Sequence, residues 1–317
     1  MTPVELSHPV YSNEEAARKH LEAVRWPDGV VCPHCGATDD ARPLGGESMG
    51  AGWFYCEACK DKFTVRSGTV YERSHVPLHK WLLAFRLMAS SKKGISAHQL
   101  HRTLNVTYKT AWFMAHRIRE AMAPAKGKAD PLGGKGKIVE ADETAIGGKE
   151  RNKHRHKRNK KNIGMHGKQI AFSLVERGGK VRSFHVANVT GETLRPIIVT
   201  QIDRASKFMT DEASQYRPVG KEFAYHGKVN HGIEEYVRGD AHVNTLEGYF
   251  SILKRGVIGT YHHVSEAHLK RYLAEFDFRY NERAGLGVDD AERTTRAIKG
   301  AEGKRLMYRQ PDKAAHA

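Results

Sequence analysis

The sequence predicts an α/β protein in which a mixed sheet is flanked by helices. A small module with four cysteines and a helical region precede this sheet. Three observations predict this order. The only four cysteines lie near the N-terminus in two C-x-x-C pairs, a purely helical pattern follows them, and strand and helix patterns alternate from residue 138 onward. An apolar content of 39% over 317 residues is enough for at least one sizeable core.

The four cysteines predict a structural metal site. Cys32 and Cys35 form the first pair and Cys56 and Cys59 the second. Each pair brings two thiolates to one ion, so together they make a closed tetrahedral zinc site, and the aromatic residues around the second pair suggest the hairpin of a zinc ribbon. A redox role is the weaker alternative, because one dithiol would suffice for it. We expect Zn²⁺ to be required for folding, since so small a module buries little surface.

Residues 78 to 122 have a helical pattern with a break in the middle. The segments SAHQLHRTL and TYKTAWFMAHRIREAM are joined by a tight turn at Asn105-Val106, and Thr107 is a suitable N-cap for the second. Two helices across such a turn fit a helix-turn-helix, whose second helix places its N-terminal residues at base edges. An ordinary helical linker between two domains is the alternative. The residues expected at DNA are Tyr108, Lys109 and Thr110, with Arg117 and Arg119 further along the helix.

The net charge of +16 favours a polyanionic partner, and nucleic acid first. A basic chain whose lysines only keep it soluble is the alternative. No run of 18 apolar residues occurs and the N-terminal segment is acidic with no apolar core, so neither a membrane helix nor a secretory signal is predicted.

A second domain is expected after the Pro-, Gly- and Lys-rich linker at residues 125–137. Its predicted order is three strands, a helix, two strands and two helices, which indicates a mixed sheet with helices on its faces. The first helix is expected to begin after Thr193, with Pro196 in its first turn. The segments that carry this pattern are KIVEADET, KQIAFSLVER, KVRSFHVANV, ETLRPIIVTQI, KFMTD, EFAYH, NTLEGYFSILKRG and VSEAHLKRYLAEFDFRYNER.

Three acids occupy positions from which they could converge. Asp142 ends the first strand of this domain, Asp211 ends the fourth, and Glu247 lies on a later helix. The first and fourth strands of such a sheet can be neighbours, and a helix across that edge can bring Glu247 to the same point. Carboxylates are ligands that suit Mg²⁺, and two such ions about 3.5–4 Å apart catalyse phosphoryl transfer. Each acid alone is weak support, since Asp142 also lies beside Glu140 and Glu143.

The helix of Glu247 has two distinct faces. Leu246, Phe250 and Leu253 recur at core spacing, while Glu247 and Lys254 share the opposite face. A surface ion-pair face is the simplest interpretation of that second face. Together with the other acids, the spacing instead suggests that Glu247 points at metal ions and Lys254 at a DNA phosphate.

The chain resembles the bacterial insertion-sequence transposases that join an N-terminal zinc ribbon to a ribonuclease H-like DDE integrase domain. The resemblance covers almost the whole chain. It is carried by CPHCG with CEAC, by VEADETAIGGKERNKH, by MTDEASQY, and by VNHGIEEYVRGDAHVNTLEGYFSILKRGVIGTYHHVSEAHLKRYLAEFDFRYN. The family implies cleavage of element ends by water and transfer of the freed 3′ hydroxyl into target DNA, with Mg²⁺ or Mn²⁺.

Carried over residue by residue, the resemblance makes Asp142 and Asp211 the first two metal ligands. Glu247 fits the third position, with the basic Lys254 seven residues on. Some relatives use asparagine there, so Asn244 on the same helix face is the alternative, and Asp240 is a lesser candidate.

A dense basic segment runs from Lys149 to Lys168 and is expected to contact DNA, although a solvated charge run is the alternative. His154, His156 and His166 lie in it without acids or cysteines at ligand spacing, so no second metal is predicted. The basic residues expected at DNA are Lys149, Lys153, Arg155, Lys157 and Arg158, with Lys254 and Arg255 on the later helix.

The predicted organisation is an N-terminal helix and zinc ribbon at 1–75, a helix-turn-helix region at 76–124, the linker at 125–137, the catalytic domain at 138–285 and a tail at 286–317. We expect a homo-oligomer, at least a dimer, on element ends and target DNA in the bacterial cytoplasm, associated with the nucleoid. A non-catalytic DNA-binding regulator and a nuclease that only hydrolyses are the competing functions. Neither the terminal repeats nor the target preference can be read from the sequence.

Overall fold

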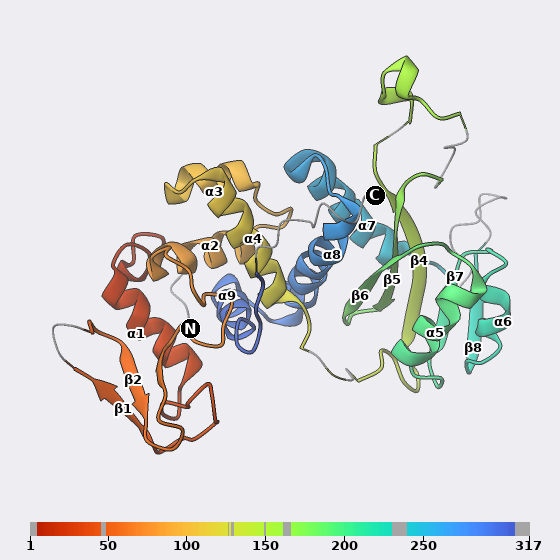
Figure 1. The fold of residues 1–317 in the computed structure, drawn as a ribbon. Helices are drawn as coiled ribbons and strands as arrows, with labels where there is room; N and C mark the ends of the chain where they lie inside the picture. The colour runs from red at the N-terminus through yellow and green to blue at the C-terminus, as the bar shows by residue number, and fades with distance from the viewer. Residues whose placement is uncertain are drawn as a thin grey trace, which may run out of the picture. The chain divides into compact units, whose positions relative to one another are not determined.

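The computed structural model describes residues 5–45, 49–125, 127, 130–148, 150–160, 166–229 and 240–307. The chain divides into two units (Figure 1). Unit 1 comprises residues 1–124 and 287–317, and unit 2 comprises residues 125–286. Across the described ranges, no helix is both long and apolar enough to cross a membrane.

Unit 1 combines a small antiparallel sheet, in the order β1-β2-β3, with a group of helices. Phe54 and Phe63 stack across β2 and β3 with ring centroids 5.6 Å apart, and Trp26 packs edge-on against both. The predicted helix pair is present, because Asn105 adopts a left-handed conformation that ends one helix and Thr107 caps the next. The elements are η1 (Pro9–Tyr11), α1 (Glu14–Arg25), β1 (Ala41–Leu44), β2 (Trp53–Cys56), β3 (Lys62–Thr64), α2 (Leu78–Ser90), α3 (Ala97–Leu104), α4 (Tyr108–Met122) and α9 (Asp290–Lys299).

The C-terminal segment differs from the predicted tail. Within it, α9 packs against α2 and belongs to unit 1. Asp289 caps its first turn, and its buried side chains include Ala291, Ala297 and Ile298. The sequence pattern was too weak to show this, because the buried face is mostly alanine and threonine and not large apolar residues.

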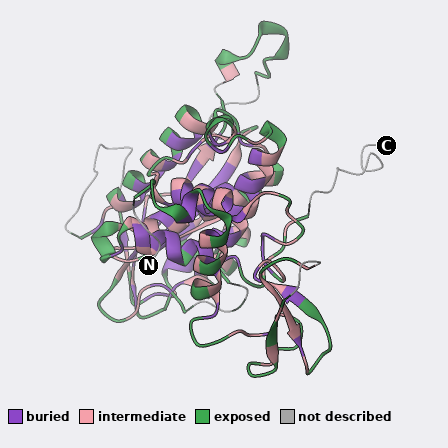
Figure 2. Ribbon diagram, turned by 90° about the vertical axis from the view of Figure 1, so that its left-hand side faces the viewer, coloured by how far each residue is buried: buried purple, intermediate pink, exposed green. Residues whose placement is uncertain are grey.

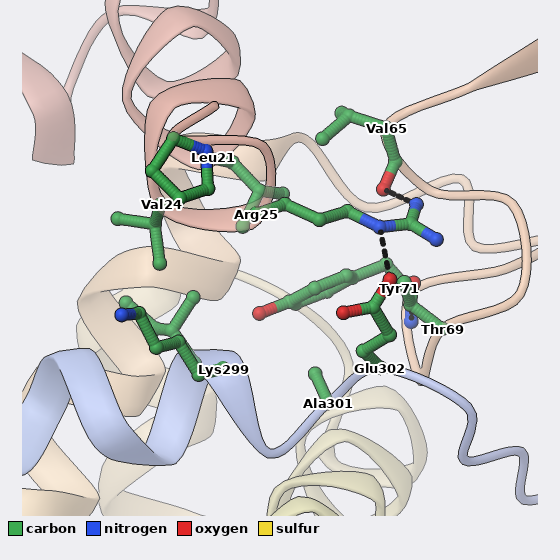
Figure 3. A pocket seen from close by; sticks show the side chains of 11 residues that line it. Leu21, Val24, Arg25, Val65, Thr69, Tyr71, Lys299, Ala301 and Glu302 are labelled. Carbon is green, nitrogen blue, oxygen red and sulfur yellow. Dashed lines mark hydrogen bonds and ion pairs between the residues drawn. The ribbon is translucent and has the colours of Figure 1, made fainter. Parts of the chain in front are cut away.

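A pocket of ≈ 210 Å³ lies within unit 1 (Figure 3). Arg25 crosses it and donates from Nε to Glu302 at 3.1 Å and from a terminal nitrogen to the carbonyl of Val65 at 2.8 Å. The Tyr71 hydroxyl is buried without a hydrogen-bond partner among the described residues, and burial raises the Tyr71 pKa. Since Arg25 and Glu302 bond each other, we assign this pocket to the packing of the unit.

Unit 2 contains a five-stranded mixed sheet in the order β6-β5-β4-β7-β8. β4 is antiparallel to β5 and parallel to β7. The prediction that the first and fourth strands of this domain are neighbours is therefore confirmed. The helix α5 begins at Gly191 with Thr190 as its cap, earlier than predicted, which leaves Pro196 inside the helix. The elements are β4 (Ile138–Ile146), η2 (Glu150–Asn152), η3 (Arg155–Lys157), β5 (Gln169–Glu176), β6 (Val181–Val186), α5 (Gly191–Gln201), β7 (Lys207–Thr210), α6 (Tyr216–Gly220), β8 (Tyr225–Lys228), α7 (Asn244–Gly256), η5 (Val257–Tyr261), α8 (Glu266–Asn281) and η6 (Ala284–Leu286).

The sheet separates two apolar cores. One face packs against α5 and α6, with Ala141, Phe172 and Phe208 in that core. The other face packs against α7 and α8, where Ala171 and Val175 meet residues such as Leu246 and Leu253. Figure 2 shows the buried residues gathered along the strands and the inner sides of these helices. Side chains alternate along a strand, so the even-numbered residues of β4, Glu140 and Asp142, lie on the face covered by α7 and α8.

Candidate metal and nucleic-acid sites

The four cysteines come together as the spacing predicted. The Sγ atoms of Cys32 and Cys59 lie 3.7 Å apart and those of Cys35 and Cys56 3.6 Å apart, and all four lie within 4.8 Å of one another. A tetrahedron with Zn–S bonds of about 2.3 Å has S···S edges of about 3.8 Å. The thiolates therefore fit one zinc ion with no position left for water.

Asp142 and Asp211 lie on neighbouring parallel strands, just beyond the last residues that these strands pair. The prediction that Asp142 ends its strand is wrong, because β4 continues to Ile146 through its pairing with β5, whereas Asp211 directly follows β7. The last paired residues of the β4–β7 ladder are Glu140 and Met209. Two residues further along each chain are Asp142 and Asp211, and an even step keeps both on the same face. The carboxylate of Asp211 also accepts the Ala213 N–H at 3.1 Å. The middle of β4 and the end of β7 thus present two acids side by side on the face covered by α7.

The helix α7 brings Glu247 to the same region. Leu246, Phe250 and Leu253 are buried in the core under the sheet, so the opposite face of the helix is exposed. Glu247 and Lys254 both lie on that exposed face. Arg255 is exposed as well, with its Nε donating to the Ser251 carbonyl at 3.1 Å. Asn244 is the first residue of α7 and is exposed.

The charges of Asp211 and Glu247 both act on Asp142. Burial first, and then the negative charge of Glu143, raise the pKa of Asp142 to about 7. The Glu143 N–H, which donates to the Asp142 carboxylate at 2.8 Å, lowers the pKa, and the charges of Asp211 and Glu247 raise it further. Negative charge crowded at one place in this way calls for a cation.

The acids do not form a tight cage. Of the described residues, only the four cysteines bring three or more candidate ligand atoms within 4.8 Å of one another. Mg²⁺ usually takes one or two carboxylates and keeps water and phosphate oxygens as its other ligands, so it does not need an all-protein cage. Hard oxygen donors at this sheet edge therefore fit such an ion.

Two neighbouring acids have other partners. Glu143, on the opposite face of β4, accepts hydrogen bonds from the Tyr216 hydroxyl and from Gln215 at 3.1 Å. Asp240 pairs with Lys207 at 3.3 Å, at the start of β7. Asp211 follows the other end of that strand, roughly 13 Å away at about 3.3 Å per residue. The structure therefore does not bring Asp240 to the other acids.

The start of α4 presents the polar residues expected at DNA. Tyr108 is 45% exposed and its ring stacks on His98 with centroids 4.3 Å apart. Lys109 is exposed, and Thr110 donates its N–H to the Thr107 hydroxyl in the cap. These residues form an accessible helix start of the kind that inserts into a major groove.

Two arginines of the same helix differ from the prediction. Arg117 donates to the carbonyl oxygens of Val70 at 2.8 Å, Glu72 at 3.1 Å and Leu306 at 3.1 Å, and Arg119 is only 2% exposed. Both therefore face the interior of unit 1, and the DNA contact predicted for them is not supported. Two residues apart, they lie on different sides of α4, and both are held because the helix is packed on more than one side.

Residues 150–160, between β4 and β5, extend beyond the sheet (Figure 1) and are mostly exposed (Figure 2). Lys153 pairs with Glu150 at 2.8 Å. Arg158 donates to the carbonyls of Arg151 at 2.7 Å and Lys153 at 2.8 Å, so this side chain organises the segment. Arg155 and Lys157 are exposed in the short helix η3. Lys149 lies outside the described residues.

Glu140 is the residue at this site that the sequence analysis left without a role. The signal was its position two residues before Asp142, which places both on one strand face. Its partners come from a helix more than a hundred residues later, so spacing gave no way to identify them.

The zinc ribbon, the helix-turn-helix and the mixed sheet with acids on two neighbouring strands define a ribonuclease H-like transposase. Comparisons agree. A family profile described as "ISXO2-like transposase domain" matches residues 131–281, and one described as "Transposase zinc-ribbon domain" matches residues 12–62. A Halobacterium salinarum (strain ATCC 700922 / JCM 11081 / NRC-1) protein, "Uncharacterized protein in transposable element ISH50", is 30% identical over 280 residues, 85% of this chain and 91% of that protein. The chain belongs to the ISXO2-like transposase family, and transposase domains bind DNA.

Proposed function

We propose that this protein cleaves the ends of an insertion sequence and joins the freed 3′ hydroxyl to target DNA by metal-assisted phosphoryl transfer. The observation that carries the proposal is the position of Asp142 and Asp211 on neighbouring strands, just beyond the β4–β7 pairing, on the sheet face covered by the helix that carries Glu247. The charges of Asp211 and Glu247, which both raise the pKa of Asp142, support the same grouping.

In this proposal Asp142, Asp211 and Glu247 hold the catalytic cations. Two Mg²⁺ or Mn²⁺ ions, when bound, activate the attacking oxygen and stabilise the leaving one. Glu247 is preferred over Asn244 as the third ligand, because its charge already acts on Asp142 and a carboxylate binds Mg²⁺ better than an amide does.

The exposed face of α7 supplies the cationic contacts to the substrate. Lys254 lies two helical turns from Glu247, about 10 Å along the axis at about 1.5 Å per residue. Its ammonium group would bind a phosphate of the DNA strand lying over the acids, and Arg255 would bind a neighbouring one. These contacts position the scissile phosphate without taking part in proton transfer.

DNA recognition is assigned to two further surfaces. Tyr108, Lys109 and Thr110 would read or grip the element end through the start of α4. The segment carrying Lys149, Lys153, Arg155, Lys157 and Arg158 would bind backbone phosphates. The zinc of the ribbon has a structural role. Because two element ends must be brought together, the protein would act as at least a dimer. It would do so in the bacterial cytoplasm, associated with the nucleoid.

The test supplies the purified protein with pre-cut element ends, a target plasmid and Mg²⁺. We expect joined products, with Asp142→Ala, Asp211→Ala and Glu247→Ala each abolishing joining while end binding stays within about twofold. Asp240→Asn is the matched control, since Asp240 lies at the other end of β7, and it should join normally. Nicked plasmid without joining would indicate a nuclease, and full activity of Asp142→Ala would overturn the proposal.

A further inference from the structure

Glu140 is a carboxylate buried beside the proposed catalytic acids. It lies two residues before Asp142 on β4, on the same face, and is 0% exposed. A buried carboxylate is costly unless hydrogen bonds and an opposite charge compensate it. Its partners therefore show what the buried charge does for the fold.

The carboxylate of Glu140 binds the start of α7. Oε2 accepts the backbone N–H of Leu246 at 3.0 Å, and Oε1 accepts the hydroxyl of Thr245 at 2.9 Å. Helix starts leave backbone N–H groups without partners, and Val243, at the cap position of α7, supplies no side-chain bond. A side chain from the sheet thus does what a local N-cap usually does, and its negative charge suits the helix N-terminus.

A cation completes this arrangement. The Nε of Arg177 lies 2.6 Å from Oε1 of Glu140, and its terminal nitrogen donates to the His242 carbonyl at 2.9 Å. The His242 Nδ1 lies 3.4 Å from the same carboxylate oxygen. The backbone N–H of Arg177 also donates to Ile138 at 3.0 Å, which fixes the arginine to the start of β4. The strand of Asp142 and the segment leading into α7 are therefore joined at one carboxylate.

We propose that Glu140 is a positioning residue that sets the separation between Asp142 and Glu247. Only Ala141 lies between Glu140 and Asp142, and Glu247 directly follows Leu246, so little chain separates the anchor from either acid. Catalytic groups must be held within about 0.5 Å of their working geometry, which needs such support. The inference rests on the proposed function, because the separation matters only if both acids hold the metal.

The test compares Glu140→Gln with Glu176→Gln. Glutamine keeps the volume but presents an amide NH₂ to donors that need an acceptor. Glu176 is the matched control, because it also accepts a backbone N–H, from Gly133 at 2.9 Å, and pairs with a cation, Lys137 at 2.8 Å, away from α7.

Three readouts follow on the full-length protein. In the zinc-bound protein without added Mg²⁺ or Mn²⁺, Glu140→Gln should lower hydrogen-exchange protection in the first turn of α7 by about tenfold relative to α8. Its affinity for Mn²⁺ alone, measured by calorimetry, should fall about tenfold, within the range for lost outer-shell support. Cleavage kcat should fall about 10²-fold, as for a small misplacement, with end binding unchanged. Glu176→Gln should change none of these.

If the Glu140→Gln protein folds and its Mn²⁺ affinity and cleavage rate equal those of wild type, the inference is overturned. Glu140 would then be a helix cap only. If that variant does not fold, Thr245→Val decides, because it removes a single hydroxyl: weakened Mn²⁺ binding supports positioning, and unchanged binding overturns it. Full cleavage by Asp142→Ala would instead contradict the proposed function. The hydrogen-exchange result for α7 does not depend on catalysis, so it distinguishes the two failures.

Discussion

Replacing Asp277 with asparagine should change how the stability of unit 2 depends on pH. Asp277, on α8, accepts three hydrogen bonds: from the N–H of Ser183 at 2.7 Å, from the hydroxyl of Ser183 at 2.7 Å and from the Tyr249 hydroxyl at 2.5 Å. These bonds favour the ionised carboxylate, yet burial is the larger effect and raises the pKa of Asp277 to about 6. The residue therefore joins α8, β6 and α7 while holding its proton more tightly in the folded state than in the unfolded chain.

The sign and size of the effect follow from that difference. Because the folded pKa is raised, the stabilisation is fully present below about pH 4, the unfolded pKa, and is lost as pH rises through about 6. A difference of about two pKa units corresponds to about 3 kcal/mol as an upper estimate. We therefore compare the free energies of unfolding of wild type and Asp277→Asn. The wild-type value minus the variant value should fall by up to about 3 kcal/mol between pH 4 and pH 7 and then stay constant.

The assay must report on unit 2 alone. All four tryptophans lie in unit 1, so their fluorescence does not follow this unit. Urea titrations at several pH values, read by a hydrogen-exchange pulse at fixed pH and mass spectrometry of β6 and α8 peptides, provide the measurement. Glu222→Gln is the control of opposite sign, because hydrogen bonds from Arg195 and Arg204 lower the pKa of that exposed carboxylate. A wild-type minus Asp277→Asn difference that is constant or rises with pH would refute the reasoning.

Three further changes test other parts of the structure. Removing zinc with a chelator, or Cys35→Ser, should unfold the ribbon and shift tryptophan emission to longer wavelength, since a module this small depends on its metal; unchanged emission in zinc-free protein would contradict this. Tyr71→Phe should be neutral or stabilise unit 1 by up to about 1 kcal/mol in urea titrations, because the buried hydroxyl has no partner among the described residues; a clear loss of stability would show a missed partner. Leu253→Ala should destabilise unit 2 by about 2–5 kcal/mol, whereas the exposed Ser251→Ala on the same helix should change it by less than about 0.5 kcal/mol; equal effects would contradict the assigned helix faces.

The parts of the fold that sequence patterns predicted are those with strong local signals. The C-x-x-C pairs located the zinc ribbon, and the apolar spacing of Leu246, Phe250 and Leu253 gave the buried face of α7. The neighbouring of β4 and β7 followed from the order of elements, and it brought Asp142 beside Asp211.

What the sequence could not show depends on contacts between distant segments. The burial of Arg117 follows from backbone carbonyls of a loop and of the C-terminal segment, which no helical pattern reveals. The helix α9 was taken for a tail because alanine and threonine give little periodic contrast. The role of Glu140 could not be read either, because strand alternation gives the face of a carboxylate but not the helix start that it meets.

The central claim is that Asp142, Asp211 and Glu247 jointly bind the catalytic cations. The most direct measurement is anomalous diffraction from crystals of the protein with Mn²⁺ and a pre-cut element end. The account predicts two manganese peaks about 3.5–4 Å apart, with Asp142 contacting both and Glu247, not Asn244, as the third ligand. Manganese bound elsewhere, with none of the three carboxylates as a ligand, would contradict it.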